Sequence, residues 1–151
     1  MSAPTRLWLA AQHHKAFLNG GWAWVRTDGS DLTGYAGGER RTTRARMTLQ
    51  GLVKALEGVT GQVQVHASGP DAAVLAGLLT PPDEPPADDP DLRKVLAPRL
   101  AALTLLRIEA APQTRLAFTQ AWADTASERA KARGPFVVAI PRPNLAKAPA
   151  K

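Results

Sequence analysis

The chain of 151 residues is predicted to fold as one α/β domain around a mixed sheet of five strands. In residues 6–40, short apolar runs alternate with turn residues, which is typical of consecutive antiparallel strands. From residue 43 onward, segments with helical spacing of apolar residues alternate with short strand-like runs, which is typical of parallel strands joined by crossover helices. The expected order is three antiparallel strands, a helix, a strand, one or two helices, a strand and a last helix.

Three segments predict the antiparallel start of the sheet. Residues 6–11 (RLWLAA) form a short apolar run and are interpreted as a buried first strand. Residues 22–25 (WAWV) have the bulky alternation of a second strand. The Asp-Gly pair within residues 27–30 (TDGS) favours a tight turn into a third strand.

The most regular helical pattern lies between residues 43 and 58. Thr42 or Thr43 can cap this helix, and Gly58 can end it. Residues 62–67 (QVQVHA) alternate polar and apolar side chains and predict the fourth strand. Residues 71–79 (DAAVLAGLL) predict a short helix behind that strand.

Proline marks the connection that follows. Residues 80–90 (TPPDEPPADDP) hold five prolines and four acids, so we expect an exposed acidic loop within the domain. Residues 91–101 predict a helix with a kink or break at Pro98. Residues 103–108 (LTLLRI) predict the fifth strand, and residues 115–133 predict a long last helix.

The end of the chain has a different composition. We expect the domain to span residues 1–134, followed in residues 135–151 by a short apolar segment and a basic tail. The apolar segment, residues 135–140 (PFVVAI), has high strand propensity, which favours docking on the domain or on the sheet edge of a partner. The tail, residues 141–151, is expected to be disordered.

The charge balance favours a particular class of partner. The chain has 19 Lys and Arg residues against 13 Asp and Glu residues, a formal net charge of +6. Such a charge favours contact with a polyanion, and above all with nucleic acid. A basic composition without any such role is the alternative.

Other classes are excluded or disfavoured by composition. The absence of cysteine excludes disulfides, thiolate metal sites and cysteine nucleophiles. No apolar run approaches the roughly 18 residues that span a membrane, and residues 1–6 lack the pattern of a secretory signal. We therefore expect a cytoplasmic protein without a membrane partner.

Two motifs connect these elements with a known family. A Gly-Gly pair at residues 20–21 precedes a bulky side chain, and residues 42–49 read TTRARMTL at the start of the first helix. Residues 91–92 (DL) are a weaker match. In these motifs and in the order of its elements, the chain resembles ribonuclease H, type 1, over residues 6–133. The resemblance implies a five-stranded sheet, three strands antiparallel and two parallel, with helices on both faces.

The resemblance also implies an active site that has lost most of its acids. Members of the family hold two divalent metals with four carboxylates, and the metals activate the water that cleaves the RNA strand. The matching positions in this chain are Ala10, Thr48, Ser68 and Asp124. Because one acid of four is retained, we expect no intact catalytic site and no bound magnesium, and we interpret the chain as an inactive homologue.

Three nearby features have simpler interpretations. The Thr-Asp-Gly-Ser motif around Asp28 matches the first acidic motif of the family, but it lies too close to Thr48 for two strands to intervene. His13 and His14 lack a third metal ligand and are interpreted as surface imidazoles. Asp124 is favourable near a helix start, or it can pair with a basic neighbour, without any catalytic role.

Basic residues gather around the start of the first helix. The predicted nucleic-acid-binding residues are Lys15, Arg40, Arg41, Arg44 and Arg46. The resemblance places Arg44 at a helix-start position that contacts the minor groove of the hybrid in the family. A site without its acids no longer repels phosphate, so it can hold nucleic acid without magnesium. The alternative is a solvated basic surface.

These observations lead to three hypotheses about function. The leading hypothesis is a ribonuclease H-like pseudoenzyme that binds a nucleic-acid duplex or an RNA–DNA hybrid, through its basic helix start and its last helix, without cleaving it. The alternative is a protein-interaction or regulatory module on the same scaffold, with residues 80–90 or 135–151 as its contact. The third is a divergent metal-dependent nuclease that uses Asp124 with Asp71, Glu57 or backbone oxygens.

Overall fold

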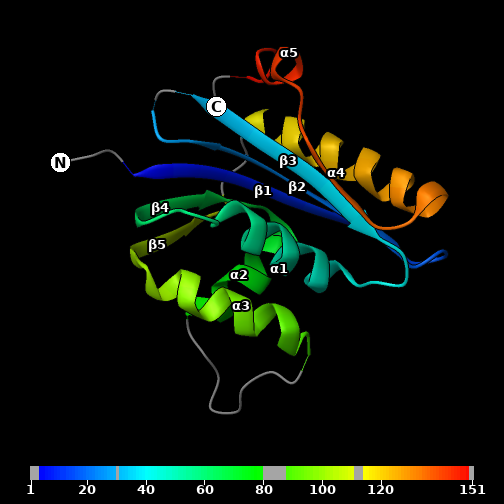
Figure 1. Ribbon diagram of the computed structural model, residues 1–151, viewed down its shortest axis with the longest axis horizontal. Coiled ribbons are helices and arrows are strands. Elements are labelled where there is room, and N and C mark those ends of the chain that lie inside the picture. The colour runs from blue at the N-terminus through cyan, green and yellow to red at the C-terminus, as the bar shows by residue number, and fades with distance from the viewer. Residues whose placement is uncertain (1–3, 30, 80–87, 111–113, 150–151) are drawn as a thin grey trace.

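A computed structural model describes residues 4–29, 31–79, 88–110 and 114–149 of the chain. These residues form a six-stranded mixed sheet with helices on both faces (Figure 1). The strands are β1 (Thr5–His14), β2 (Asn19–Thr27), β3 (Leu32–Glu39), β4 (Gly61–His66), β5 (Leu103–Glu109) and β6 (Phe136–Ala139). The helices are α1 (Arg44–Ala55), α2 (Gly69–Leu79), α3 (Pro90–Ala101), α4 (Thr114–Arg133) and α5 (Arg142–Leu145).

The order of strands in the sheet is β5-β4-β1-β2-β3-β6. β1, β2 and β3 pair antiparallel, whereas β4 pairs parallel with β1 and β5 pairs parallel with β4. The mixed α/β sheet predicted from the sequence is therefore confirmed. The predicted count of five strands is wrong, because β6 pairs antiparallel with β3 and adds a sixth strand.

β6 reaches the sheet because the chain reverses direction after α4. Gly134 has a φ of +89°, and its N–H donates to the carbonyl oxygen of Ala130 at 2.8 Å, which ends the helix in a left-handed turn. The next residues then pair with β3 over Tyr35 to Gly38. The apolar segment thus lies on the domain's own sheet. Where a disordered tail was expected, α5 follows, and its Leu145 is buried.

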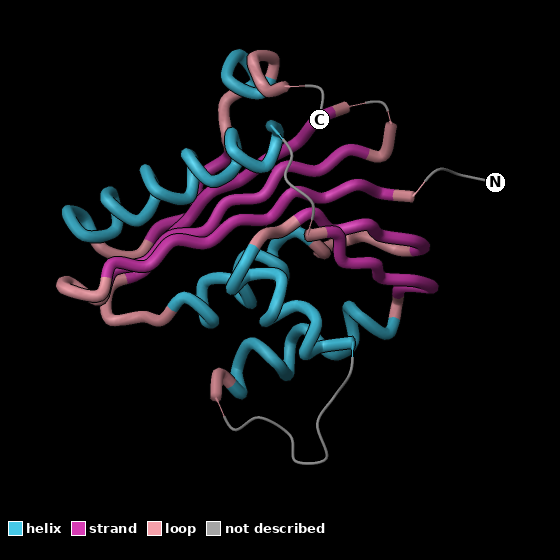
Figure 2. Tube along the Cα trace, turned by 180° about the vertical axis from the view of Figure 1, so that it is seen from behind, coloured by secondary structure: helices cyan, strands magenta, loops and turns pink. Residues whose placement is uncertain are grey.

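The helices form two layers on either side of the sheet. α1, α2 and α3 lie on one face, and α4 lies on the other face over β1, β2 and β3 (Figures 1 and 2). The alternation along β1 supplies both layers. Leu7, Leu9 and Ala11 join the core on the side of α1, whereas Trp8 and Ala10 join the core under α4.

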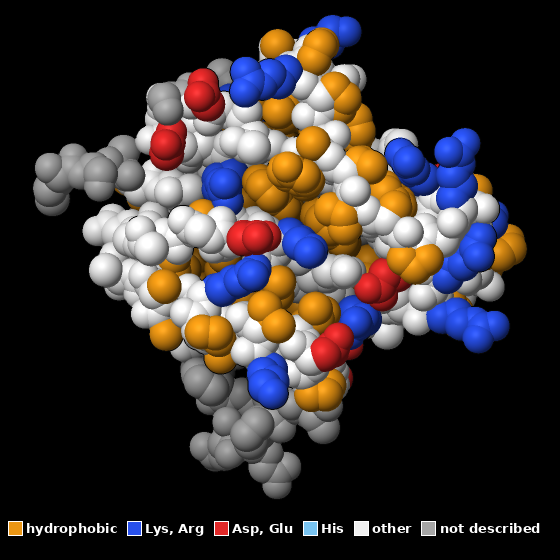
Figure 3. Space-filling model, in the orientation of Figure 1, with side chains coloured by type: hydrophobic (Ala, Val, Ile, Leu, Met, Phe, Trp, Pro, Cys, Tyr) orange, Lys and Arg blue, Asp and Glu red, His pale blue; other side chains and the backbone are white. Residues whose placement is uncertain are grey.

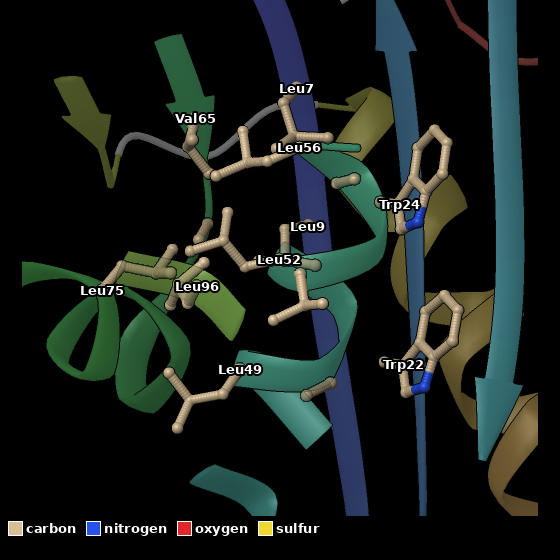
Figure 4. Close-up of a cluster of buried hydrophobic side chains, with 14 of the residues drawn as sticks. Leu7, Leu9, Trp22, Trp24, Leu49, Leu52, Leu56, Val65, Leu75 and Leu96 are labelled. Carbon is tan, nitrogen blue, oxygen red and sulfur yellow. The ribbon is translucent and has the colours of Figure 1, made fainter. Parts of the chain in front are cut away.

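The larger core joins α1 to the sheet and to the two neighbouring helices. Figure 4 shows Leu52 of α1 between Leu9 of β1 and the side chains of Leu75 and Leu96, which come from α2 and α3. Trp22 of β2 lies on the other side of α1 and is fully buried. Burial of each such side chain stabilises the fold by about 1.5–3 kcal/mol, so this core fixes α1 on the sheet.

Two glycines let α4 approach the sheet closely. A Cβ atom on Gly21 would lie 2.4 Å from the carbonyl oxygen of Ala123 and 2.4 Å from the amide nitrogen of Ser127. A Cβ atom on Gly38 of the neighbouring strand would lie 3.0 Å from the carbonyl oxygen of Ala126. The backbone of α4 occupies the space that a side chain would need, which explains why both strand positions require glycine.

Local signals in the sequence correspond to the ends of elements. The side chain of Thr43 accepts a hydrogen bond from the amide of Arg46 at 3.1 Å and caps α1. Gly29, with a φ of +110°, lies in the turn between β2 and β3. Of the predicted acidic loop, residues 80–87 lie outside the described part of the chain, and Pro90 begins α3. None of the helices in the described ranges is long and apolar enough to cross a membrane.

Candidate functional site

A buried carboxylate lies where β1, α1 and α2 meet. Asp71, in the first turn of α2, has 1% of its surface exposed. Its Oδ2 accepts a hydrogen bond from the backbone amide of Ala11 at 3.1 Å, and its Oδ1 accepts one from Nε of Arg44 at 3.0 Å. The hydroxyl of Thr48 lies 3.3 Å from the same Oδ1. We call these four residues, Ala11, Arg44, Thr48 and Asp71, the Asp71 cluster.

The topology of the sheet explains this position of Asp71. β1 and β4 run parallel, so the chain leaves β4 beside the middle of β1. The carbonyl oxygen of Ser68 accepts the amide of Asp71 at 3.1 Å, which starts α2 and turns the Asp71 side chain back toward β1. Thr48 follows Arg44 by one turn of α1, so both side chains face the carboxylate from the same helix.

The Asp71 cluster balances its own charge. Asp71 is buried, whereas the side chain of Arg44 is 34% exposed, so the guanidinium joins a buried anion to the surface. Removing either partner leaves a desolvated group without its counter-charge, which makes such pairs costly to break. A divalent metal would need several oxygen ligands, and the described residues contain no group of three or more His, Asp or Glu side chains that could hold one.

The motif match did not assign Asp71 to any of the four acidic positions of the family. The motif match assigned Ser68 to the third acidic position, and Asp71 entered only as a replacement ligand for a divergent nuclease. The start of α2 brings Asp71 against β1, whereas the side chain of Ser68 lies against α4. An acid in the first turn of a helix that follows a parallel strand was the available signal.

The other positions of the expected acidic site have different surroundings. Ala10 is fully buried in the core under α4, on the opposite face of β1 from the Asp71 cluster. The hydroxyl of Ser68 accepts a hydrogen bond from Nε2 of Gln120 on α4 at 3.0 Å. Asp124 follows Gln120 by one turn and is exposed. The structure thus brings Thr48 together with Asp71, and Ser68 together with Gln120.

Arg46, a predicted nucleic-acid contact, is held by three carboxylates. It forms ion pairs with Glu39 at 3.2 Å, Asp89 at 3.2 Å and Asp91 at 2.9 Å. The hydrogen bonds from Arg46 lower the pKa of Asp91, and they raise the pKa of the Arg46 guanidinium. These pairs tie the start of α1 to β3 and to the start of α3, so this arginine has an internal structural role.

Arg40, a second predicted contact, caps the end of α4. Its Nε donates to the carbonyl oxygens of Ala130 and Lys131, both at 3.2 Å. These oxygens belong to the last turn of the helix, where a positive charge is favourable. Arg40 itself is exposed, so its guanidinium lies at the surface while it joins β3 to α4.

Arg41 and Lys15, the two remaining predicted contacts, are also exposed. Arg41 has a φ of +51°, a left-handed conformation that is uncommon for residues other than glycine. The amide of the next residue, Thr42, donates to the carbonyl oxygen of Leu18 at 2.9 Å. This bond joins the connection after β3 to the β1–β2 hairpin that carries Lys15.

Several cations meet at one end of the molecule, which we call the basic end. Its members are Lys15, Arg40, Arg41, Lys131 and Arg133. Figure 3 shows Lys and Arg side chains gathered on this side, over the β1–β2 hairpin and the end of α4. Lys131 and Arg133 were not among the predicted contact residues, although the last helix was expected to take part, because basic residues in a last helical turn are common and do not reveal which loop lies beside them.

A second charged cluster lies under the start of α4. His66 is 2% exposed and stacks on Trp8, with ring centroids 5.2 Å apart. Nη2 of Arg6 lies 3.3 Å from Nε2 of His66, and the guanidinium of Arg115 lies 4.4 Å from the centroid of the Trp8 ring. Burial lowers the pKa of His66, the charge of Arg6 lowers it further, and Glu109 opposes both effects. Burial and the charge of Arg6 therefore favour the neutral form of His66.

Comparisons with known proteins do not assign this arrangement to a family. No protein-family model matches the chain, and no curated protein matches it.

Proposed function

We propose that this protein is a ribonuclease H-like domain that binds a nucleic-acid duplex or an RNA–DNA hybrid without cleaving it. The observation that carries the proposal is the Asp71 cluster, in which the guanidinium of Arg44 supplies the positive charge beside a buried carboxylate. The order of strands, with helices on both faces, supports the likeness in fold.

The chemistry of the cluster favours binding over cleavage. Metal-assisted hydrolysis in this family needs carboxylates that converge on two cations. Here Ala10 and Ser68 carry no charge, and Thr48 offers a hydroxyl. Asp71 already accepts hydrogen bonds from Ala11 and Arg44, so its oxygens are occupied within the protein. We therefore expect binding that requires no magnesium.

The charge pattern indicates where a polyanion would lie. The basic end presents exposed cations from the β1–β2 hairpin, the connection after β3 and the last turn of α4. Along α4 itself, Asp124 and Glu128 are exposed and would repel phosphate. A nucleic-acid backbone is therefore expected to cross the basic end toward the start of α1, and not to follow α4.

A binding titration tests this proposal. We expect a fluorescent RNA–DNA hybrid to bind in the presence of a chelator, with an affinity that falls at least ten-fold between about 50 and 200 mM salt. The variant Lys15→Glu/Arg41→Glu should bind much more weakly. A variant with the same change in net charge, Lys94→Glu/Lys147→Glu, should bind like the wild type because both positions are exposed and neither belongs to the basic end.

Two results would contradict the proposal. An affinity that does not change with salt would remove the electrostatic basis of binding. Cleavage of the hybrid with manganese that is abolished by Asp71→Asn would instead favour the divergent nuclease.

The interaction module remains the second candidate because of the free sheet edge at β6. Val137 in this strand is 47% exposed, and only one edge of β6 pairs within the described residues. An exposed apolar edge strand can add a strand from another protein. If the wild type retains no nucleic acid, and Val137→Lys loses a protein partner that the wild type retains, this second function is the correct one.

A further inference from the structure

Two large apolar side chains are exposed side by side at the tip of the β1–β2 hairpin. Phe17 is 57% exposed and Leu18 is 50% exposed. Single exposed apolar residues are common on protein surfaces and need no explanation. This pair differs because it projects from the basic end, where Lys15, Arg41 and Lys131 surround it.

The ring of Phe17 is held in place by its neighbours. Nζ of Lys131 lies 3.6 Å from the ring centroid, a distance at which an ammonium group is attracted to the face of the ring. The imidazole of His14 lies 5.1 Å away, tilted by 36°. The ammonium of Lys131 lies over one face of the ring, and Phe17 as a residue is 57% exposed. The exposed part of the ring is therefore open to a ligand.

The backbone around the tip is also fixed. Leu18 has a φ of +58°, and Arg41, in the connection that bonds to it, has a φ of +51°. The amide of Leu18 donates to the carbonyl oxygen of His14 at 2.7 Å, and the carbonyl oxygen of Leu18 accepts the amide of Thr42 at 2.9 Å. Two left-handed residues other than glycine carry a cost that persists only where the surroundings enforce the conformation. The tip is therefore a rigid, preorganised surface.

We infer that Phe17 is a stacking platform for an unpaired base of the bound nucleic acid, with Lys131 over one face of its ring and Lys15 and Arg41 nearby to bind the flanking phosphates. This inference rests on the proposed function and adds that the bound nucleic acid has a single-stranded segment. Aromatic side chains in a cationic surface bind single strands by stacking on successive bases. Bases inside a duplex have no free face, so such a platform favours an overhang, a gap or a frayed end.

The size of the apolar tip favours a base over a membrane surface. Two side chains bury too little apolar area for stable membrane attachment, which depends on a whole amphipathic face or on lipid chains. One ring is enough to stack on one base. Glu39, an acid on the neighbouring strand, is paired with Arg46 and does not cancel the cations around the tip.

The experiment compares two ligands and three variants. The ligands are a short blunt duplex and the same duplex with a single-stranded extension. We expect the wild type to bind the extended duplex more tightly, and Phe17→Ala to lose about ten-fold affinity for it while its affinity for the blunt duplex changes little. Phe17→Trp should keep the preference, and the fluorescence of the added indole should be quenched on binding. Leu105→Ala, a control at a 46% exposed position on β5, should match the wild type.

The possible outcomes separate this inference from the proposed function. If the wild type binds both ligands equally and Phe17→Ala changes neither affinity, the platform is wrong, while salt-dependent binding of the blunt duplex still supports the proposed function. If neither ligand binds at any salt concentration, both are wrong. Binding to vesicles of anionic lipid that is lost in Phe17→Ala, without binding of either duplex, would overturn the platform in favour of a membrane surface. Phe17 is exposed, so the variants should fold, and circular dichroism verifies this.

Discussion

The Asp71 cluster and the basic end use arginine in opposite ways. In the Asp71 cluster, Arg44 donates to a carboxylate that is 1% exposed, so the charge is used inside the protein. At the basic end, Arg41 is exposed and lies beside the hairpin tip. The two arginines are three positions apart in one basic motif. The elements folded around a residue, and not the motif it belongs to, therefore decide whether its charge is available to a ligand.

The largest expected effect comes from removing the buried acid. Asp71→Ala leaves the buried amide of Ala11 without its acceptor and Arg44 without its counter-charge. We expect the free energy of unfolding to fall by about 2–4 kcal/mol, measured by urea denaturation. Asp124→Ala, the same substitution at an exposed position, should change it by less than about 0.5 kcal/mol. Equal effects in the two variants would show that the Asp71 cluster does not hold the fold together.

A second prediction tests whether the basic end depends on the packing of α4. Gly21→Ala places a methyl group 2.4 Å from the helix backbone, so α4 must move away from the sheet. We expect a loss of about 1–3 kcal/mol in the free energy of unfolding, together with weaker nucleic-acid binding because Lys131 moves relative to Phe17. Gly77→Ala is the control, since a Cβ there meets open space within α2 and should stabilise the helix slightly. Unchanged stability in Gly21→Ala would contradict the close approach of α4.

A smaller effect is expected in how the free energy of unfolding depends on pH, because of His66 under the start of α4. Burial and the charge of Arg6 lower the pKa of His66 in the folded state, so the unfolded chain takes up the proton first as the pH falls. Stability from this group is fully present above the unfolded pKa, about 6.5, and declines as the pH falls below it. We expect denaturation at pH 7 and pH 5 to show a smaller decline in His66→Phe than in the wild type. His14→Gln, at an exposed position, should follow the wild type, and an identical decline in His66→Phe would contradict the assignment.

Local parts of the fold could be predicted from the sequence because their causes are local. The Thr43 cap, the Asp-Gly turn and the alternation in β1 each depend on residues close in the chain. The pairing of β6 with β3 could not be predicted in the same way. It depends on the reversal at Gly134 and on which sheet edge is free, both of which are known only once α4 is placed.

The candidate site could be predicted only in part, for a related reason. The motif match placed Thr48 where the family has an acid, and it indicated cations near the start of α1. It assigned the third acidic position to Ser68, whereas the acid that contacts Thr48 and Arg44 is Asp71. The contacts of Arg46 with Asp89 and Asp91 come from residues more than 40 positions later, at the end of the acidic loop and just after it. The contact of Lys131 with Phe17 joins still more distant segments. Pairings at such separations follow from the tertiary fold, which local patterns do not specify.

The salt dependence of binding in two arginine variants shows whether the basic end contacts the nucleic-acid backbone. The affinity for a hybrid is measured against salt concentration, without magnesium, for the wild type, Arg41→Gln and Arg46→Gln. We expect the slope of log affinity against log salt to decrease by about 0.9 in Arg41→Gln, because one phosphate contact is lost, and to stay unchanged in Arg46→Gln, whose charge is already balanced by three carboxylates. A slope that decreases in Arg46→Gln and not in Arg41→Gln, or binding that appears only with magnesium, would contradict this description of the molecule.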